Sequence, residues 1–186
     1  MIPAPLGNLL ANLPATVAAK IAAALPGLRE CSGMSGGFDL EDLKAQGIAA
    51  PAVRVSAMNI RPIGTGAGPH RRWGVEMAAF IITKDALGLS RDVAAANIAQ
   101  ALLILIPDQN WSTTGYGPAE RVELKVLVGT QSRKLAAHLS AVVWLQPVVL
   151  STLPPVEEIP IQLYAGQDPD IGPGNEDAYD PIGEAG

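Results

Sequence analysis

Hydrophobic periodicity divides the first 150 residues into segments of helix and strand. Residues 6–25 carry leucine, valine and isoleucine at spacings of three and four, which is typical of an amphipathic helix. Proline fits the first turn of a helix and not its interior, so we expect the main helix to begin near Pro14. Pro26 and Gly27 end it. Residues 30–37 are rich in glycine and serine, and this composition predicts a loop.

Two extended segments follow. Residues 51–60 alternate apolar and polar side chains and predict a first strand. Residues 73–83 become apolar on both faces toward their end, as expected of a central strand. The connection from Arg61 to Arg72 is rich in glycine and proline and is too long for a tight turn, so it predicts a mobile tip.

The clearest helix signal lies at residues 93–106. Ser90 is a good N-cap, Asp92 is a carboxylate in the first turn where the helix dipole favours it, and Pro107 stops the helix. Apolar side chains cover an unusually wide part of this helix. Such a surface indicates burial on a sheet and is compatible with a second contact to another subunit.

Two further strands complete the pattern, after a polar loop at residues 111–118. Residues 120–128 alternate strictly, which predicts a strand with one wet face, and residues 135–149 predict a long final strand. The order is helix, strand, strand, helix, strand, strand. We therefore expect an α+β fold in which a four-stranded, mainly antiparallel sheet is backed by two main helices.

The periodicity ends at Ser151. The last 36 residues contain six prolines, five glycines, eight acidic residues and no basic residue, and so cannot assemble a core. We expect a domain at residues 1–150 and an extended or disordered acidic arm at residues 151–186. The apolar side chains of the arm are candidate docking anchors, chiefly Val156, Ile159, Ile161, Leu163, Tyr164 and Tyr179.

Charge is scarce and unevenly distributed. The arm carries −8, whereas the first 150 residues hold ten acidic and 13 basic residues, a net charge of +3. Only 17% of all residues are charged, against roughly 25% in an average protein. A surface with so little charge is explained either by dilution with alanine or by neighbours that cover it. The opposite charges of body and arm allow them to pair within one chain or between subunits.

No residue pattern indicates catalysis or a bound cofactor. Cys31, His70 and His138 are isolated in the sequence, without the spacing of a nucleophile motif or a metal site. Asp168, Asp170 and Glu176 do not have the spacing of a calcium loop. The glycines at 64–68 lead through Pro69 into a strand, whereas a phosphate loop leads into a helix. We expect a protein without metal or cofactor that is not an enzyme.

The single cysteine excludes a disulfide within the chain, and the longest apolar run, residues 101–106, is far shorter than the roughly 20 residues that cross a bilayer. These features predict a soluble protein that is compatible with a reducing cytoplasm.

Basic residues gather at the predicted tip between the first two strands: Arg61, His70, Arg71 and Arg72. One tip has too few charges for strong binding to DNA, because affinity follows the number of phosphates neutralised. Repeated around a ring, the same tip would line a pore with positive charge. A solvated loop and a contact between subunits are the alternatives.

The succession of these segments resembles the tail terminator (tail-completion) proteins of long-tailed bacteriophages, particularly the Mu-like minor tail family. The resemblance covers about residues 5–150. It is carried by an N-terminal helix and by these segments: Ala50–Val55, the strand ending at Phe80–Thr83, the helix opened by Ser90-Arg-Asp, the loop at Trp111 and the strand at Trp144-Leu-Gln.

The resemblance implies a virion protein that forms a hexameric ring on the head-proximal end of the tail tube. Such a ring stops tube polymerisation and contacts the head-tail connector, and DNA passes through its lumen without sequence-specific binding. A head-tail connector or neck subunit is the alternative within the same assembly. A small-molecule-binding domain or an enzyme is the alternative from another class. The acidic arm is not expected from the resemblance.

Overall fold

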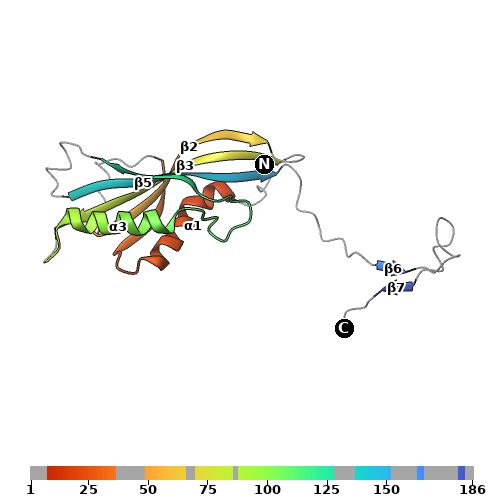
Figure 1. Ribbon diagram of the computed structural model, residues 1–186, viewed down its shortest axis with the longest axis horizontal. Helices are drawn as coiled ribbons and strands as arrows, with labels where there is room; N and C mark the ends of the chain where they lie inside the picture. The colour runs from red at the N-terminus through yellow and green to blue at the C-terminus, as the bar shows by residue number, and fades with distance from the viewer. Residues whose placement is uncertain are drawn as a thin grey trace, which may run out of the picture. The chain divides into compact units, whose positions relative to one another are not determined.

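The computed structural model describes residues 8–36, 49–65, 70–85, 88–127, 137–151, 163–165 and 180–182. The chain divides into two compact units, residues 1–152 and residues 153–186. The first unit is an α+β domain with two described helices, α1 (Leu9–Ala24) and α3 (Arg91–Leu105). Both helices lie on the same face of one sheet (Figure 1).

The sheet has five strands in the order β1-β2-β3-β5-β4. Their bounds are β1 Glu30–Ser35, β2 Ala52–Thr65, β3 His70–Lys84, β4 Glu120–Val126 and β5 Ala137–Ser151. β1 runs parallel to β2, and all other pairs are antiparallel. The two expected hairpins, β2–β3 and β4–β5, are present, and β3 pairs with β5 to join them.

The expectation of four mainly antiparallel strands was wrong in the number and order of the strands. The missed strand is β1, whose glycine and serine content predicted a loop. β1 is extended because it pairs with β2 and packs closely against α1, and neither contact can be predicted from the composition of residues 30–35. A Cβ at Gly33 would lie 2.6 Å from the backbone nitrogen of Ala15 in α1, so only glycine lets this strand pass so close to the helix.

Helix α1 begins at Leu9, and Pro14 lies inside it. The expected start near Pro14 was therefore wrong. Proline removes one hydrogen bond from a helix interior. Here Pro14 is buried, and its neighbours Leu13 and Val17 are fully buried against the sheet. Burial of this apolar face offsets the lost hydrogen bond and keeps the helix continuous.

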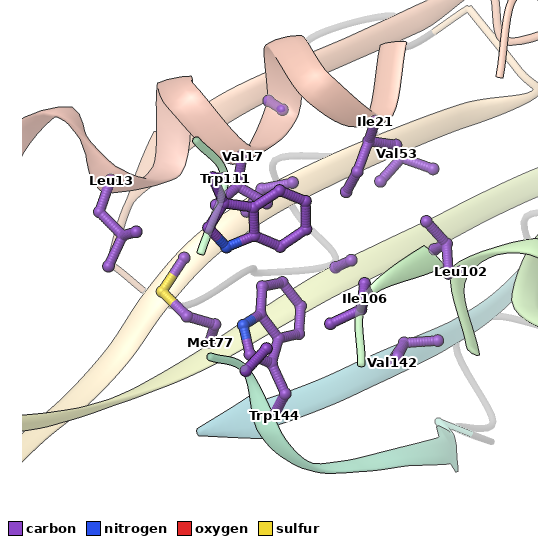
Figure 2. Close-up of a cluster of buried hydrophobic side chains, with 14 of the residues drawn as sticks. Leu13, Val17, Ile21, Val53, Met77, Leu102, Ile106, Trp111, Val142 and Trp144 are labelled. Atoms are coloured by element: carbon purple, nitrogen blue, oxygen red, sulfur yellow. The ribbon is translucent and has the colours of Figure 1, made fainter. Parts of the chain in front are cut away.

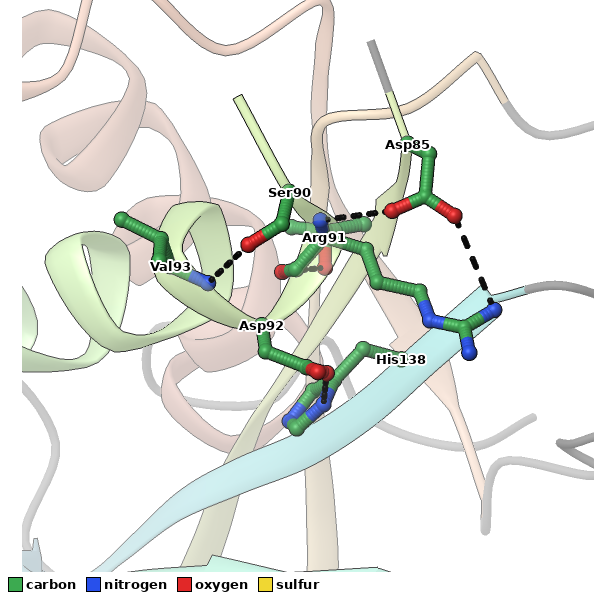
Figure 3. A network of polar contacts seen from close by, with 7 residues as sticks. Asp85, Ser90, Arg91, Asp92, Val93 and His138 are labelled. Carbon is green, nitrogen blue, oxygen red and sulfur yellow. Dashed lines mark hydrogen bonds and ion pairs between the residues drawn. The ribbon is translucent and has the colours of Figure 1, made fainter. Parts of the chain in front are cut away.

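Helix α3 has the predicted start. The Ser90 side-chain oxygen accepts a hydrogen bond from the Val93 N–H at 3.4 Å, and Asp92 lies in the first turn. At this end of the helix His138 of β5 lies 2.8 Å from Asp92, and Asp85 accepts a hydrogen bond from the Arg91 N–H (Figure 3). His138 is a half-buried residue of β5, and its contact with Asp92 holds the start of α3 against the sheet.

The main core lies between the two helices and the sheet (Figure 2). It contains Val17 and Ile21 of α1, Leu102 of α3 and the central residues of β2, β3 and β5. The segment 111–118, expected to be a polar loop, lies within the loop at residues 107–119 and adds two buried aromatic residues to the core, Trp111 and Tyr116. The Tyr116 hydroxyl donates a hydrogen bond of 2.7 Å to the Leu9 carbonyl, which ties this loop to α1.

The second unit contains a short antiparallel pair of strands, β6 (Leu163–Ala165) and β7 (Asp180–Ile182). The sequence predicted no strand after Ser151. Of the candidate docking anchors, Leu163 and Tyr164 belong to β6, whereas Val156, Ile159, Ile161 and Tyr179 lie outside the described residues. The role of this unit stays a prediction.

Candidate functional site

The β2–β3 hairpin carries all four basic residues that were predicted at its tip. The sequence predicted that they lie in a loop, but the structure places them on strands, because β2 continues to Thr65 and β3 begins at His70. Long-range pairing of β3 with β5 as far as Ser151 supports this extension. Only residues 66–69 remain between the two strands, and they lie outside the described residues.

Strand register distributes these bases over both faces of the sheet. Arg61 is opposite Gly74, and Gly74 shares a face with Arg72 two residues before it. Arg71 lies on the other face, the one covered by the helices. Arg61 and Arg72 therefore share a face, whereas the sequence placed all the bases in one cluster. His70 has a buried Nδ1 atom without a hydrogen-bond partner in the described part of the chain.

Arg61 has a partner of opposite charge. Its guanidinium lies 3.5 Å from the Glu76 carboxylate, and both side chains are about half exposed. An exposed ion pair of this kind stabilises a protein by less than about 1 kcal/mol. Arg71 and Arg72 are exposed and form no ion pair with any described residue. Among the described residues, the positive charge of the hairpin that has no acidic partner is therefore concentrated at its far end.

A groove of about 430 Å³ is lined by Arg61 and Glu76 together with three charged residues of β4, namely Arg121, Glu123 and Lys125. Lys125 and Glu123 form an ion pair of 2.9 Å. Arg121 has a φ of 55° at a β-bulge and forms no ion pair within the described ranges. The charges largely balance one another, so the groove is polar without being strongly basic.

The sequence pattern predicted that Arg121, Glu123 and Lys125 lie on the solvent-exposed face of a strand. It did not predict that they line the same groove as Arg61. The signal that joins them is the pairing of β3 and β4 with opposite edges of β5. This pairing joins segments that are far apart in the sequence, so the local alternation of apolar and polar residues does not predict it.

The exposed side of the helical layer is almost without charge. The exposed residues of α3 after Asp92 are Val93, Ala96, Asn97, Gln100 and Ile104. Val93, Asn97, Gln100 and Ile104 follow one another at spacings of four, three and four and form a continuous strip, here called the α3 outer stripe. Ile104 is 74% exposed and Val93 is 49% exposed. Helix α1 adds a single charge, Lys20, to this side.

An apolar groove of about 330 Å³ adjoins this stripe, between α3 and the turn that follows α1. Leu25, Leu28, Leu89 and Ile98 contribute large side chains, and Asn97 is the one polar residue in its lining. We call it the helix-layer groove.

A second concentration of exposed aliphatic side chains lies on β4, a strand at the edge of the sheet. Leu124 is 41% exposed and Val126 is 57% exposed. They lie opposite Val142 and Ser140, on the face of the sheet that carries the helices. The charged residues Glu123 and Lys125 alternate with them and point to the other face. Leu124 and Val126 form the β4 apolar row.

The isolated Cys and His residues stay apart in the fold. His70 begins β3 and His138 lies opposite Thr83 near its other end, a separation of roughly 40 Å at about 3.3 Å per residue. Cys31 lies on β1, where its thiol donates a hydrogen bond to the Ala18 carbonyl at 3.2 Å, and burial raises the pKa of that thiol to about 11. Burial therefore keeps the Cys31 thiol protonated at neutral pH, and its hydrogen bond goes to the Ala18 carbonyl and not to either histidine.

The described residues contain neither a metal cluster nor a membrane-spanning helix. None of them form a group of three or more His, Cys, Asp or Glu side chains suited to a metal ion. Neither described helix combines the length and the apolar character that a membrane crossing requires.

No protein-family model matches this chain, and a search of curated proteins found no significant match.

Proposed function

We propose that this chain is a structural subunit of a bacteriophage tail, which assembles into a ring that closes the tail tube and joins it to the head connector. The observation that supports the proposal best is the exposed side of α3. A helix that is hydrophobic on every face is normally buried on all sides, and the outer face of α3 carries the exposed aliphatic side chains of Val93 and Ile104 beside Asn97 and Gln100. Helix α3 has no charged residue after Asp92, and yet its outer stripe is exposed in the single chain.

A repeated structural subunit accounts for this surface, because copies of the chain cover each other in the assembly. The low overall charge fits the same interpretation, since interface cores are depleted of charged residues. The order of the predicted segments resembles that of tail terminator proteins, and this resemblance is the reason for proposing a ring on the tail tube in particular.

The test is tube polymerisation in the presence of the purified chain. Tail tube protein is allowed to extend, and the chain is added at increasing ratios while tube length is followed by electron microscopy. A terminator stops extension and is seen at one end of each tube. Unlimited extension, with the chain bound only to the isolated head connector, would instead identify a neck subunit and overturn the proposal.

Contact with DNA is a separate part of the proposal. Arg71 and Arg72 at the far end of the hairpin, with Arg61 on the same face as Arg72, would face the lumen of the ring and contact phosphates without sequence preference. Replacing all three with serine is then expected to impair genome passage and to leave ring formation intact. Normal infectivity of particles that carry the triple variant would reject this role.

A further inference from the structure

We infer that the groove of about 430 Å³ lined by residues of β2, β3, β4 and β5 binds a single carboxylate of an acidic peptide segment, and that the guanidinium of Arg121 holds this carboxylate. We call it the charged groove. Its occupant is a segment of a partner protein in which a glutamate or an aspartate lies next to aliphatic residues. The inference goes beyond the proposed ring and does not rest on it, because one chain supplies the whole lining of the groove.

Charged side chains from three strands converge on the charged groove. They are Arg61 of β2, Glu76 of β3, and Arg121, Glu123 and Lys125 of β4. Arg61 pairs with Glu76 at 3.5 Å, and Lys125 pairs with Glu123 at 2.9 Å. Arg121 forms no ion pair with any described residue. The groove therefore has one uncompensated positive charge with which to bind a ligand.

The backbone of Arg121 has a conformation that arginine rarely adopts. Its φ of 55° lies in the left-handed region, which favours glycine. Arg121 belongs to a bulge, because β4 advances three residues from Glu120 to Glu123 while β5 advances two from Leu145 to Val143. Bulges redirect side chains and are frequent beside active sites, and strained residues cluster where a function needs them. We therefore attribute the arginine at this position to ligand binding and not to the stability of the strand.

The charges of the groove favour a single carboxylate over a polyanion. Glu76 and Glu123 lie in the same groove and repel DNA, which carries a negative charge on every phosphate. One carboxylate matches the planar guanidinium of Arg121, because its two oxygens accept two parallel N–H bonds. The charged groove thus differs from the far end of the β2–β3 hairpin, where Arg71 and Arg72 form no ion pair with a described residue.

The exposure of the groove favours a peptide segment over a small molecule. The four paired side chains are between 43% and 60% exposed, so the groove is open to water. Sites for small molecules bury most of the ligand surface, and an open groove cannot do so. The lining also includes the apolar side chains of Met58, Val143 and Leu145, which suit aliphatic neighbours of the carboxylate.

The experiment measures the binding of two blocked tripeptides to the full chain by saturation-transfer NMR, which detects weak binding to a single chain and to an assembly alike. The probe is acetyl-Ile-Glu-Ile-amide, and acetyl-Ile-Gln-Ile-amide replaces its carboxylate with a neutral amide. We expect the dissociation constant of the glutamine peptide to be at least about tenfold higher, because a hydrogen bond to a charged group is the stronger one. Binding of the glutamate peptide should weaken as the salt concentration rises.

Three variants locate the binding. Arg121→Gly removes the guanidinium and suits the left-handed backbone, so it is expected to fold and to bind the glutamate peptide at least about tenfold more weakly than the wild type. Arg121→Lys keeps the charge but loses the planar fork, and its affinity should lie between the two. Arg29→Ala is the matched control, because Arg29 is exposed and does not line the groove. Unfolding curves establish that all three variants are folded.

Several results would overturn the inference. The glutamate peptide fails to bind, or the two peptides bind equally well. Arg121→Gly binds the glutamate peptide as tightly as the wild type does, or Arg29→Ala loses as much affinity as Arg121→Gly. A DNA duplex that displaces the glutamate peptide from the wild type, but does not bind Arg121→Gly, would assign the groove to nucleic acid instead. None of these results bears on ring formation, which electron microscopy of the same protein tests separately.

Discussion

The side-chain oxygen of Gln146 accepts a hydrogen bond of 2.7 Å from the indole N–H of Trp111, across 35 positions of the sequence. The same oxygen accepts a second bond from the Trp144 indole at 3.1 Å. The amide nitrogen of Gln146 donates to the carbonyls of Gln109 and Gly117. One fully buried glutamine thereby satisfies four polar groups and fixes the loop at residues 107–119 to the sheet.

Replacing Gln146 with leucine removes the side-chain amide that forms all four of these hydrogen bonds. Two indole N–H groups and the Gly117 carbonyl then lose their hydrogen bonds, each at a cost of about 1–3 kcal/mol unless water reaches it, whereas the Gln109 carbonyl still accepts a bond of 2.9 Å from the Ala119 N–H. We expect the free energy of unfolding to fall by about 2–4 kcal/mol, measured by urea denaturation and tryptophan fluorescence. Gln109→Leu is the control, since the contact of Gln109 with Gln146 uses its backbone carbonyl. Equal stability of the two variants would contradict this account of the loop.

This network shows where prediction from the sequence ended. Residues 111–118 were interpreted as a polar loop, because serine, threonine and glycine surround Trp111 and Tyr116. Local composition says nothing of a glutamine on a distant strand that accepts an indole N–H. The loop is part of the core because of hydrogen bonds to Gln146, and these bonds form only when the distant segments fold together.

Local signals predicted the rest of the core well. The Ser90 cap and Asp92 marked the start of α3, and alternation marked both hairpins, because these signals depend on neighbouring residues. The missed strand β1 and the longer β2–β3 hairpin depend on pairing between distant segments. For the same reason the sequence identified Arg61 but did not place it beside Arg121 and Lys125.

Gly33 gives a direct test of the close packing between β1 and α1. In Gly33→Ala the new Cβ would lie 2.6 Å from the Ala15 backbone nitrogen and 2.7 Å from the Pro14 carbonyl carbon, and backbone atoms cannot move aside cheaply. We expect a loss of about 1–3 kcal/mol in the free energy of unfolding. Gly27→Ala, which meets no atom within 4 Å, should lie within about 0.5 kcal/mol of the wild type. A Gly33 variant as stable as the Gly27 variant would refute this packing.

Cys31 is expected to react slowly with thiol reagents. Burial raises the pKa of its thiol to about 11, so little reactive thiolate exists at pH 8. Alkylation by iodoacetamide at this pH should be on the order of a hundredfold slower in the folded chain than in urea, where the thiol has its ordinary pKa of about 8.5. Similar rates in the two states would show that the thiol is not protected.

The same shift predicts the direction of an alkaline effect. The folded state prefers the neutral thiol, so its contribution to stability is complete below about pH 8.5 and is lost as the pH rises toward 11. Cys31→Ala removes this contribution, and its stability should therefore fall less steeply over that range. Parallel curves for the variant and the wild type would contradict the assignment to Cys31.

Deletion of residues 153–186 should leave the first unit folded. The described core clusters all belong to residues 1–152, and the deleted part includes β6 and β7. We expect near-ultraviolet circular dichroism and the unfolding midpoint of the truncated chain to match those of the full chain. Its assembly or its binding to partners should weaken, because the deletion removes a segment with a net charge of about −8. Unchanged assembly and unchanged tail joining would remove any role of this segment in either.

We propose that this chain is a ring-forming structural subunit. The most direct measurement is electron microscopy of the purified full chain, alone and bound to tail tubes. The account predicts discrete rings with a central hole, and one such ring at the end of each tube. Single globular particles that neither close into rings nor bind tubes would contradict it.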